Sequence, residues 1–427
     1  MRKIINEVAA MEFKREQYLK MLIDCMHNGL IKVITGMRRS GKSYLLFNLF
    51  TRYLRQSGVP GSHIVPIELD VWENRQYRNP GAILDYIESR IEDSANYYIL
   101  LDEVQMLDGF EEALNSLLHV KNVDIYVTGS NSKFLSKDVI TEFRGRGYEI
   151  HVYPLTFKEF MESYEGDIYR GWADYVVYGG LPLVASMKTE AQKVKYLTDL
   201  FAETYLKDII ERNRIEKTQE LEDVVNILAS SVGSLTNPSK ILATFRSELH
   251  SQISLNTVRR YVEYLEDAFV ISAAQRYDVK GRKYVGSPLK YYFEDVGLRN
   301  ARLGFRQTEE NHIMENVIYN ELRSRGFAVD VGMVRKRERD AGGKQLARQL
   351  EIDFVANLGS RRYYVQSAFS LAGVEKTAQE KAPLNCLGDS FKKIIVVKDV
   401  VNVTRDANGI TTMNVFDFLT KENSLEL

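Results

Sequence analysis

The sequence predicts an α/β protein that begins with a parallel sheet covered by helices. Apolar, strand-like runs at residues 31–35, 97–101 and 124–128 alternate with segments of helical periodicity up to about residue 155. Such alternation is typical of a parallel sheet with helices on its faces. Another apolar run, at residues 63–70, contains Pro66. Because proline cannot donate to a strand ladder, we expect this strand at an edge of the sheet.

The chain is long enough for several domains. It has 427 residues, of which 44% are hydrophobic and 27% charged, a balance typical of globular proteins. After the first α/β region the pattern becomes mainly helical, then gives three helices with a β-ribbon, and then returns to α/β. We therefore expect four domains, at residues 1–160, 161–215, 216–303 and 304–427.

Residues 36–43 read GMRRSGKS and match the phosphate-binding loop pattern G-x-x-x-x-G-K-[ST]. A strand precedes the motif and an amphipathic helix follows it, as its physics requires. Glycines let backbone N–H groups point at a polyphosphate, and the helix N-terminus adds partial positive charge. Lys42 would reach the β- and γ-phosphates of ATP, and Ser43 would hold Mg²⁺. The residues expected to bind the nucleotide are Gly36, Met37, Arg38, Arg39, Ser40, Gly41, Lys42, Ser43 and Tyr44.

A second apolar strand ends in two carboxylates, Asp102 and Glu103. Ligands bind at the carboxyl ends of strands in open α/β sheets, so we expect Asp102 to face the Mg²⁺ site. Glu103 is the candidate general base, which would polarise water for attack on the γ-phosphate. The alternative is a solvated pair of carboxylates at a strand end.

Two further segments supply candidate catalytic residues. The strand at residues 124–128 leads to small polar residues, among which Asn131, or else Ser130, would sense the γ-phosphate or orient water. Arg144 and Arg146 lie in a glycine-rich turn. One of them would act as an arginine finger on a neighbouring subunit's nucleotide, which requires a homo-oligomer. For each arginine, a surface salt bridge is the alternative.

Charge and cysteine content restrict the possible partners and compartments. The 57 Lys and Arg residues nearly balance the 58 Asp and Glu residues, so a contact with DNA must be a local basic surface. Cys25 and Cys386 lack the spacing of a zinc site, and two distant cysteines make no disulfide framework. We find no signal-type apolar segment and no membrane-spanning run. We therefore expect a cytoplasmic protein that does not contact a membrane.

The helices and strand-like runs of residues 216–303 predict a winged helix. In such modules the third helix enters the DNA groove. The candidate DNA contacts on its surface are Asn256, Thr257, Arg259 and Arg260. Winged helices also serve as protein-packing modules, and nearby acidic residues dilute the positive charge of this helix. DNA contact and protein packing therefore both remain open.

Three residues of the C-terminal region follow the order of acidic residues in nucleases of the restriction-endonuclease type. They are Glu315 on a predicted helix, Asp353 on a strand and Gln366 on the next strand. In those nucleases carboxylates hold Mg²⁺ and a lysine helps to activate water. Here Gln366 replaces the second strand acid, and Ala368 stands where the lysine would be. We therefore expect a remnant site without nuclease activity.

A basic run at residues 335–339 is predicted to be a loop that either contacts phosphates or is solvated.

Together these motifs resemble those of a large, mostly uncharacterised group of bacterial and archaeal ATPases of the AAA type. The resemblance covers nearly the whole chain. The matching stretches are residues 34–43, 101–105, 128–132, 143–146, 178–182 and 351–355. It implies a P-loop domain joined to a C-terminal domain of unknown function that is like a degenerate restriction nuclease. With the residue patterns, the predicted fold is a P-loop NTPase (AAA-type) parallel sheet with a helical lid, a winged-helix module and a C-terminal α/β restriction-nuclease-like domain. The resemblance also implies that Lys42, Ser43, Asp102 and Glu103 bind and hydrolyse ATP.

The leading hypothesis is a Mg²⁺-dependent ATPase that couples hydrolysis to conformational change on DNA. The first alternative is a slow, ATP-dependent switch or scaffold that binds a protein partner. Assembly with that partner, without DNA-stimulated hydrolysis, would favour it. The second alternative is an ATP-gated nuclease, which requires metal-dependent cleavage of a nucleic acid.

Overall fold

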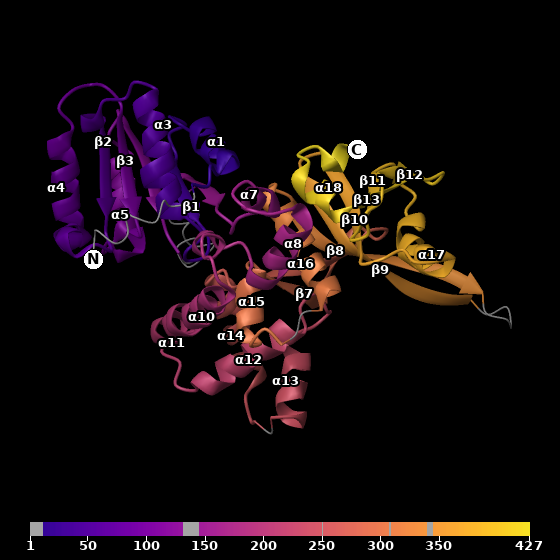
Figure 1. The fold of residues 1–427 in the computed structure, drawn as a ribbon. Helices are drawn as coiled ribbons and strands as arrows, with labels where there is room; N and C mark the ends of the chain where they lie inside the picture. Colours follow the sequence, from indigo (N-terminus) through magenta and orange to yellow (C-terminus); the bar gives the residue numbers. More distant parts are fainter. Residues whose placement is uncertain (1–11, 131–144, 250, 307–308, 340–344) are drawn as a thin grey trace. The chain divides into compact units, whose positions relative to one another are not determined.

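The computed structural model describes residues 12–130, 145–249, 251–306, 309–339 and 345–427 (Figure 1). Contacts divide the chain into two compact units, Met1–Pro154 with Asp267–Phe269, and Leu155–Glu266 with Val270–Leu427. The domain boundary expected near residue 160 lies close to this division. The boundaries expected near residues 215 and 303 fall inside the second unit.

The first unit is built on a five-stranded parallel sheet with the strand order β2-β3-β4-β1-β5. Its strands are β1 (Ile31–Thr35), β2 (Ile64–Glu68), β3 (Tyr97–Asp102), β4 (Val123–Thr128) and β5 (Gly147–His151). The strand that contains Pro66 lies at an edge, as the sequence predicts. The two strands that carry the phosphate-loop and acidic motifs, β1 and β3, are separated by β4. The carboxyl ends of all three therefore meet at one edge of the sheet.

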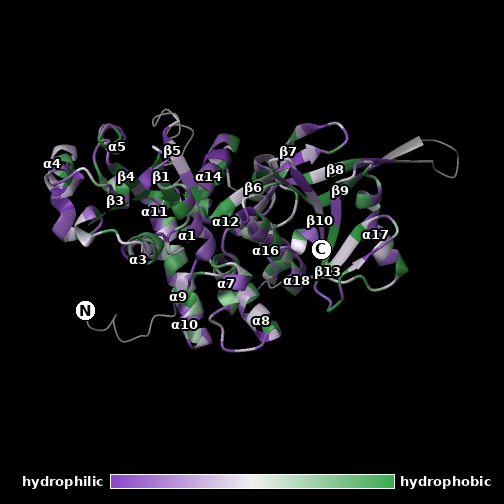
Figure 2. Ribbon diagram, turned by 90° about the horizontal axis from the view of Figure 1, so that it is seen from above, coloured by the Kyte–Doolittle hydropathy of each residue, from purple (hydrophilic) through white to green (hydrophobic). Residues whose placement is uncertain are grey.

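Helices cover both faces of this sheet (Figure 1). On one face lie α1 (Glu16–Asp24), α2 (Lys42–Tyr44), the π-helix η1 (Leu45–Phe50) and α3 (Thr51–Gln56). On the other face lie α4 (Pro80–Arg90) and α5 (Phe110–Leu117). Short 3₁₀ helices are η2 (Gly61–His63), η3 (Trp72–Arg78) and η4 (Val104–Met106). Successive residues of β3 enter opposite cores, Ile99 and Leu101 on the α4 side and Tyr98 and Leu100 on the α1 side, so this strand reads as a continuous apolar run. Figure 2 shows the strands of this sheet between the helices on its two faces.

One ion pair is buried inside this sheet. The Lys32 ammonium on β1 pairs with the Asp124 carboxylate on β4, and both side chains are buried. Asp124 Oδ2 also accepts hydrogen bonds from the Tyr126 hydroxyl at 2.8 Å and from the His27 N–H at 3.1 Å. Because each buried charge has polar partners, the pair is tolerated within an apolar layer.

The second unit contains an eight-stranded sheet with the order β12-β13-β11-β10-β9-β8-β6-β7. Its strands are β6 (Ile271–Asp278), β7 (Lys283–Phe293), β8 (Ala328–Arg339), β9 (Gln345–Leu358), β10 (Arg361–Ala368), β11 (Lys392–Val397), β12 (Thr404–Arg405) and β13 (Ile410–Asn414). Its helices are α7 (Phe157–Met161), α8 (Ile168–Tyr178), α9 (Pro182–Ala185), α10 (Glu190–Leu200), the π-helix η6 (Phe201–Leu206), α11 (Lys207–Asn213), α12 (Thr218–Ser230), α13 (Pro238–Ser247), α14 (Leu255–Asp267), α15 (Val296–Arg302), α16 (Glu310–Ser324), α17 (Val374–Asn385), α18 (Val415–Thr420) and the 3₁₀ helix η7 (Ser424–Glu426).

The β-ribbon expected as a wing is part of this larger sheet. Strand β6 pairs with β7 on one side and in parallel with β8 on the other. The three helices and the ribbon are thus present, but the ribbon is not a free wing. The helical segment at residues 161–215 also belongs to the second unit by its contacts, and its function as a lid stays a prediction.

The basic run at residues 335–339 was expected to be a loop, and this expectation is wrong. These residues form the end of β8, which pairs in register with β9 as far as Arg339 opposite Gln345. In this two-stranded part of the hairpin, alternate residues exchange backbone hydrogen bonds with the opposite strand, so pairing does not require apolar side chains.

The motif at residues 178–182, Tyr-Gly-Gly-Leu-Pro, packs against the start of α15. Asp295 Oδ2 accepts a hydrogen bond from the Gly180 N–H at 2.8 Å, and Oδ1 accepts one from the Leu298 N–H at 2.9 Å. A Cβ on Gly297 would lie 2.1 Å from the Tyr178 carbonyl oxygen, so only glycine permits this approach. The motif therefore fixes α8 to α15 and has a structural explanation.

Burial raises the pKa of Asp295 to about 6, although backbone N–H groups partly offset the effect. The folded state therefore holds the proton more tightly than the unfolded state, so this group's stabilisation is complete below about pH 4 and is lost as pH rises through about 6. We expect the loss to be about 3 kcal/mol in wild type and absent in Asp295→Asn. Urea unfolding of a Trp72→Phe background, in which the buried Trp172 reports on the second unit, measures it. A variant of the exposed Asp399, Asp399→Asn, is the control, and an unchanged pH dependence in Asp295→Asn would refute the assignment.

Candidate functional site

The phosphate-loop motif lies between β1 and α2, as the sequence predicts. A Cβ on Gly36, which has a φ of 129°, would lie 2.2 Å from the Val152 carbonyl oxygen, so glycine is required there. Gly41, with a φ of 99°, precedes the first helical residue, Lys42. Lys42 is 5% exposed, and its Nζ donates to the carbonyl oxygens of Gly36 at 3.0 Å and Met37 at 2.9 Å. The lysine therefore lies over the backbone of its own loop.

One buried hydroxyl group in this loop makes no hydrogen bond among the described residues. It belongs to Ser40, which is fully buried. Such an atom is costly inside a protein unless a ligand or water satisfies it. Tyr44, at the other end of the motif, is half-buried and packs its ring against the core under η1, so it can serve a ligand only through its backbone.

Asp102 connects the loop to the neighbouring strands. Its Oδ1 accepts a hydrogen bond from Ser43 Oγ at 3.1 Å and another from Thr128 Oγ1 at the end of β4. Burial raises the pKa of Asp102, while the hydrogen bonds from Thr128 and Ser43 act against the rise. A serine hydroxyl beside a carboxylate is an oxygen donor set that suits Mg²⁺. A bound cation would also favour the ionised carboxylate that burial disfavours.

Glu103 adopts a left-handed backbone conformation, with a φ of 48°, directly after β3. Its N–H donates to Thr128 Oγ1 at 3.0 Å. Its Oε2 accepts from Ser130 Oγ at 3.0 Å and from the Gln105 side-chain amide. A strained residue in a turn that several neighbours hold in place is common at catalytic sites. The sequence indicated Ser130 near this site but assigned no role to Thr128 and Gln105, although both lie in stretches that match the family.

The expected arginine-finger and sensor residues are only partly described. Asn131 and Arg144 lie outside the described residues. Arg146 is exposed, and its carbonyl oxygen accepts from the Ile31 N–H, so it lies at the amino end of β1. The phosphate loop follows the carboxyl end of that strand, about 15 Å away. Arg146 is thus distant from the loop of its own unit, and action on a neighbouring subunit stays a prediction.

In the second unit, the structure brings Glu315, Asp353 and Gln366 together. The Ser367 N–H donates to Asp353 Oδ2 at 2.8 Å, and the Asp353 N–H donates to Gln366 Oε1 at 3.4 Å. The Gln366 amide donates to Glu380 on α17 at 3.1 Å. Gln366 therefore connects the acidic cluster to a neighbouring helix.

A lysine that the sequence did not indicate lies among these carboxylates. Lys290 on β7 is 3% exposed, and its Nζ lies 2.8 Å from Glu315, 2.8 Å from Glu351 and 3.6 Å from Asp353. Burial alone would lower the pKa of Lys290, but the three carboxylates outweigh it and the pKa is raised. Burial, followed by Glu315, raises the pKa of Asp353. The ammonium thus neutralises the cluster, and within the described ranges no group of acidic, histidine or cysteine side chains is arranged to hold a metal ion.

The four candidate DNA contacts lie at the start of α14. Asn256, Arg259 and Arg260 are exposed. The Thr257 hydroxyl already makes a hydrogen bond at the start of the helix, with the Ser254 hydroxyl at 2.8 Å. Thr257 and Arg260 also line a cavity of about 410 Å³, together with the acidic Glu216 and Glu220 among others. The positive charge on this surface is therefore partly balanced.

No helix in the part of the chain that is described has both the length and the apolar character needed to cross a membrane.

Comparison with known proteins identifies two regions of the chain. Residues 28–161 match the family model described as "AAA domain", and residues 169–309 match "Domain of unknown function (DUF8612)". The first match covers the five-stranded sheet with its phosphate loop. The second covers the segment from α8 to α15, including β6 and β7.

Two full-length relatives extend this result. An uncharacterized protein of Haemophilus influenzae is 34% identical over 411 residues, which cover 95% of this chain and 98% of that protein. The uncharacterized protein MJ1544 of Methanocaldococcus jannaschii is 26% identical over 413 residues, which cover 93% of this chain and 86% of that protein. Among solved structures, the ORC1 protein of Aeropyrum pernix in complex with DNA is 15% identical, with a TM-score of 0.29 over 70% of this chain and 94% of that chain, too low for a functional argument. The chain thus belongs to a family of uncharacterised bacterial and archaeal proteins that contain an AAA domain followed by the domain of unknown function.

Proposed function

We propose that this protein is a Mg²⁺-dependent ATPase that couples hydrolysis to conformational change on DNA. The observation that carries the proposal is the hydrogen-bonded network at the carboxyl edge of the first sheet. There the hydroxyl groups of Ser43 and Thr128 both donate to Oδ1 of Asp102. Glu103 follows Asp102 in the chain, and its N–H donates to the Thr128 hydroxyl. The network joins the loop that would bind phosphates to the residue that would activate water.

Each of these side chains has a distinct function in the proposed reaction. The N–H groups of the loop and the ammonium of Lys42 bind the phosphates and offset their negative charge. Ser43 and Asp102 hold Mg²⁺, which neutralises charge on the phosphate oxygens when bound. Glu103 orients a water molecule and accepts its proton at a carboxylate oxygen. The water oxygen bonds to the γ-phosphorus while the bond to the β–γ bridging oxygen breaks, giving ADP and phosphate.

One feature of the site favours slow turnover and thereby the switch as a second candidate function. Glu103 Oε2 already accepts hydrogen bonds from Ser130 and Gln105. At least one of these must give way before that oxygen can accept a proton from water. A partner that moves Ser130 or Gln105 would therefore accelerate hydrolysis. In the leading proposal that partner is DNA, and in the switch it is a protein.

Steady-state ATP hydrolysis with and without single- and double-stranded DNA separates these two functions. If DNA is the partner, its addition should raise the rate about tenfold in wild type, which corresponds to about 1.4 kcal/mol of activation energy. Glu103→Gln should show no such stimulation. A slow rate that is indifferent to both forms of DNA would reject the DNA-coupled proposal and leave the protein-binding switch. Sedimentation at saturating ATP tests the homo-oligomer that an arginine finger at Arg144 or Arg146 requires.

A further inference from the structure

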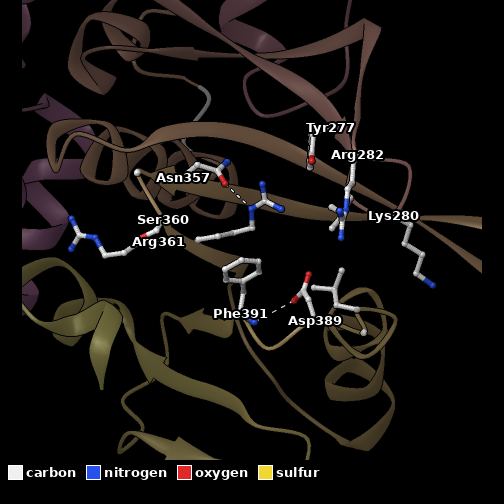
Figure 3. A pocket seen from close by; sticks show the side chains of 13 residues that line it. Tyr277, Lys280, Arg282, Asn357, Ser360, Arg361, Asp389 and Phe391 are labelled. Atoms are coloured by element: carbon white, nitrogen blue, oxygen red, sulfur yellow. Dashed lines mark hydrogen bonds between the residues drawn. The ribbon is translucent and has the colours of Figure 1, made fainter.

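The second unit contains a cavity of about 680 Å³ that none of the functions above uses (Figure 3). Three connections line it: the β6–β7 turn, the β9–β10 turn and the segment between α17 and β11. Its volume falls within the range of small-molecule sites, about 300–1,000 Å³. Arg362, which lines this cavity, lies on β10 four residues before Gln366 and on the same face of the strand. The cavity is therefore about 13 Å from the Lys290 cluster along that strand.

The cavity is lined with positive charge. Lys280, Arg282, Arg361 and Arg362 contribute four cations, against one carboxylate, Asp389. That carboxylate is already occupied, because Oδ2 accepts from the Tyr364 hydroxyl at 2.6 Å and Oδ1 from the Phe391 N–H at 3.3 Å. Within the described part of the chain, no acidic side chain forms an ion pair with any of the four cations. An anion is the ligand that this charge favours.

Aromatic rings lie beside the cations. The Arg362 guanidinium is 5.4 Å from the ring centroid of Tyr277 and 5.4 Å from that of Phe391. Its Nε donates to Asn357 Oδ1 at 2.7 Å, which fixes the group between the rings. Phe391 remains 38% exposed and lines the cavity, so part of its apolar side chain is accessible there. Flat apolar rings beside cations are the combination that binds an unpaired base with its phosphate.

The arrangement of the cations favours a chain of nucleotides over a single one. In Figure 3, Tyr277 and Arg282 lie on one side and Asp389 and Phe391 on the other, while Lys280 and Arg361 extend away in opposite directions. Exposed basic residues continue beyond the β6–β7 turn at Lys283 and, two residues past the last β6–β8 pair, at Arg335. A duplex does not fit this description, because its bases are stacked inside the helix and cannot enter a cavity.

We propose that this cavity binds single-stranded nucleic acid, with one base against Phe391 and the flanking phosphates on Arg282, Lys280 and Arg361. This inference rests on the proposed function, because it names single strands as the form of DNA that the protein binds. All of the residues that would bind the strand lie in the second unit. Its test is made without ATP or Mg²⁺. Failure of this site therefore leaves ATP hydrolysis unaffected, and failure of hydrolysis leaves this site unaffected.

Fluorescence anisotropy of a labelled oligothymidylate of about 12 nucleotides, titrated with the full chain at about 50 and 200 mM salt, measures the binding. We expect Arg282→Glu to weaken binding about tenfold or more and to reduce the salt dependence. Phe391→Leu, which keeps an apolar side chain but removes the ring, should weaken binding about fivefold or more with the salt dependence unchanged. The matched control is Arg405→Glu, an exposed arginine on β12 at the far edge of the same sheet, which should change the affinity less than about twofold.

An abasic oligonucleotide gives a second test that does not depend on the folding of a variant. Wild type should bind it with the same salt dependence but about fivefold more weakly, and Phe391→Leu should cause no further loss. Equal affinity for RNA and DNA single strands would support the site. The proposal is overturned by an equal loss in Arg405→Glu, by no binding at low salt, or by competition from thymidine monophosphate at the same concentration as the oligonucleotide.

Discussion

Replacing Lys42 by alanine should reduce the affinity for Mg-ATP about a hundredfold or more. Charge-assisted hydrogen bonds from a buried ammonium to two phosphates contribute about 3 kcal/mol, which corresponds to that factor. The ammonium is already placed, since Lys42 is 5% exposed and lies over the loop that would hold the phosphates. Little conformational entropy is therefore lost on binding.

Isothermal titration of wild type and Lys42→Ala with Mg-ATP measures this loss. Lys20→Ala, which removes an exposed lysine from α1 in the same unit, is the matched control and should bind as wild type does. The thermal midpoint of each variant verifies that the unit is folded. An affinity of Lys42→Ala within about threefold of wild type would mean that the loop does not bind phosphate through this lysine.

Replacing Lys290 by methionine should destabilise the second unit by about 3–5 kcal/mol at neutral pH, because it leaves Glu315, Glu351 and Asp353 without a counter-charge. The loss should shrink as pH falls, since protonation removes the repulsion among the carboxylates. Millimolar Mg²⁺ or Mn²⁺ should restore stability to the second unit of Lys290→Met and leave that of wild type unchanged, because in wild type the ammonium already lies among these three carboxylates.

Urea unfolding in the Trp72→Phe background, followed through Trp172, measures these changes. Lys381→Met is the matched control, since Lys381 pairs with Asp406 at 2.7 Å but is partly exposed, and should cost less than about 1 kcal/mol. If Lys290→Met costs no more than this control, the ammonium is not what neutralises the cluster. If divalent cations stabilise wild type equally, they bind elsewhere.

The parts of the site that could be predicted from the sequence are those whose chemistry is local. Lys42 and Ser43 follow a strand within one short motif, and Asp102 and Glu103 end another strand, so spacing alone places them. That β1 and β3 lie in one parallel sheet follows from the strand and helix alternation. Pro66 likewise placed β2 at the edge.

The parts that could not be predicted depend on long-range pairing. Lys290 lies on β7, which the sequence assigned to a separate ribbon, and only the shared eight-stranded sheet brings it to Glu315 and Asp353. Thr128 had no predicted role, and it becomes part of the site because β4 lies between β1 and β3. The basic run ending at Arg339 was predicted to be a loop because its five consecutive charged residues show no apolar alternation, and its pairing with β9 is set by the distant sequence of that strand.

In the proposed function, the network around Asp102 and Glu103 hydrolyses ATP. The most direct test compares steady-state phosphate release by wild type and Glu103→Gln, with the affinity of both for Mg-ATP measured in parallel. The glutamine keeps the shape of the side chain and its acceptor oxygen but cannot take a proton from water. We predict that the variant binds Mg-ATP as wild type does and releases phosphate about a hundredfold more slowly. Equal rates in the two proteins would contradict the assignment of Glu103, and the absence of hydrolysis in wild type would contradict the ATPase itself.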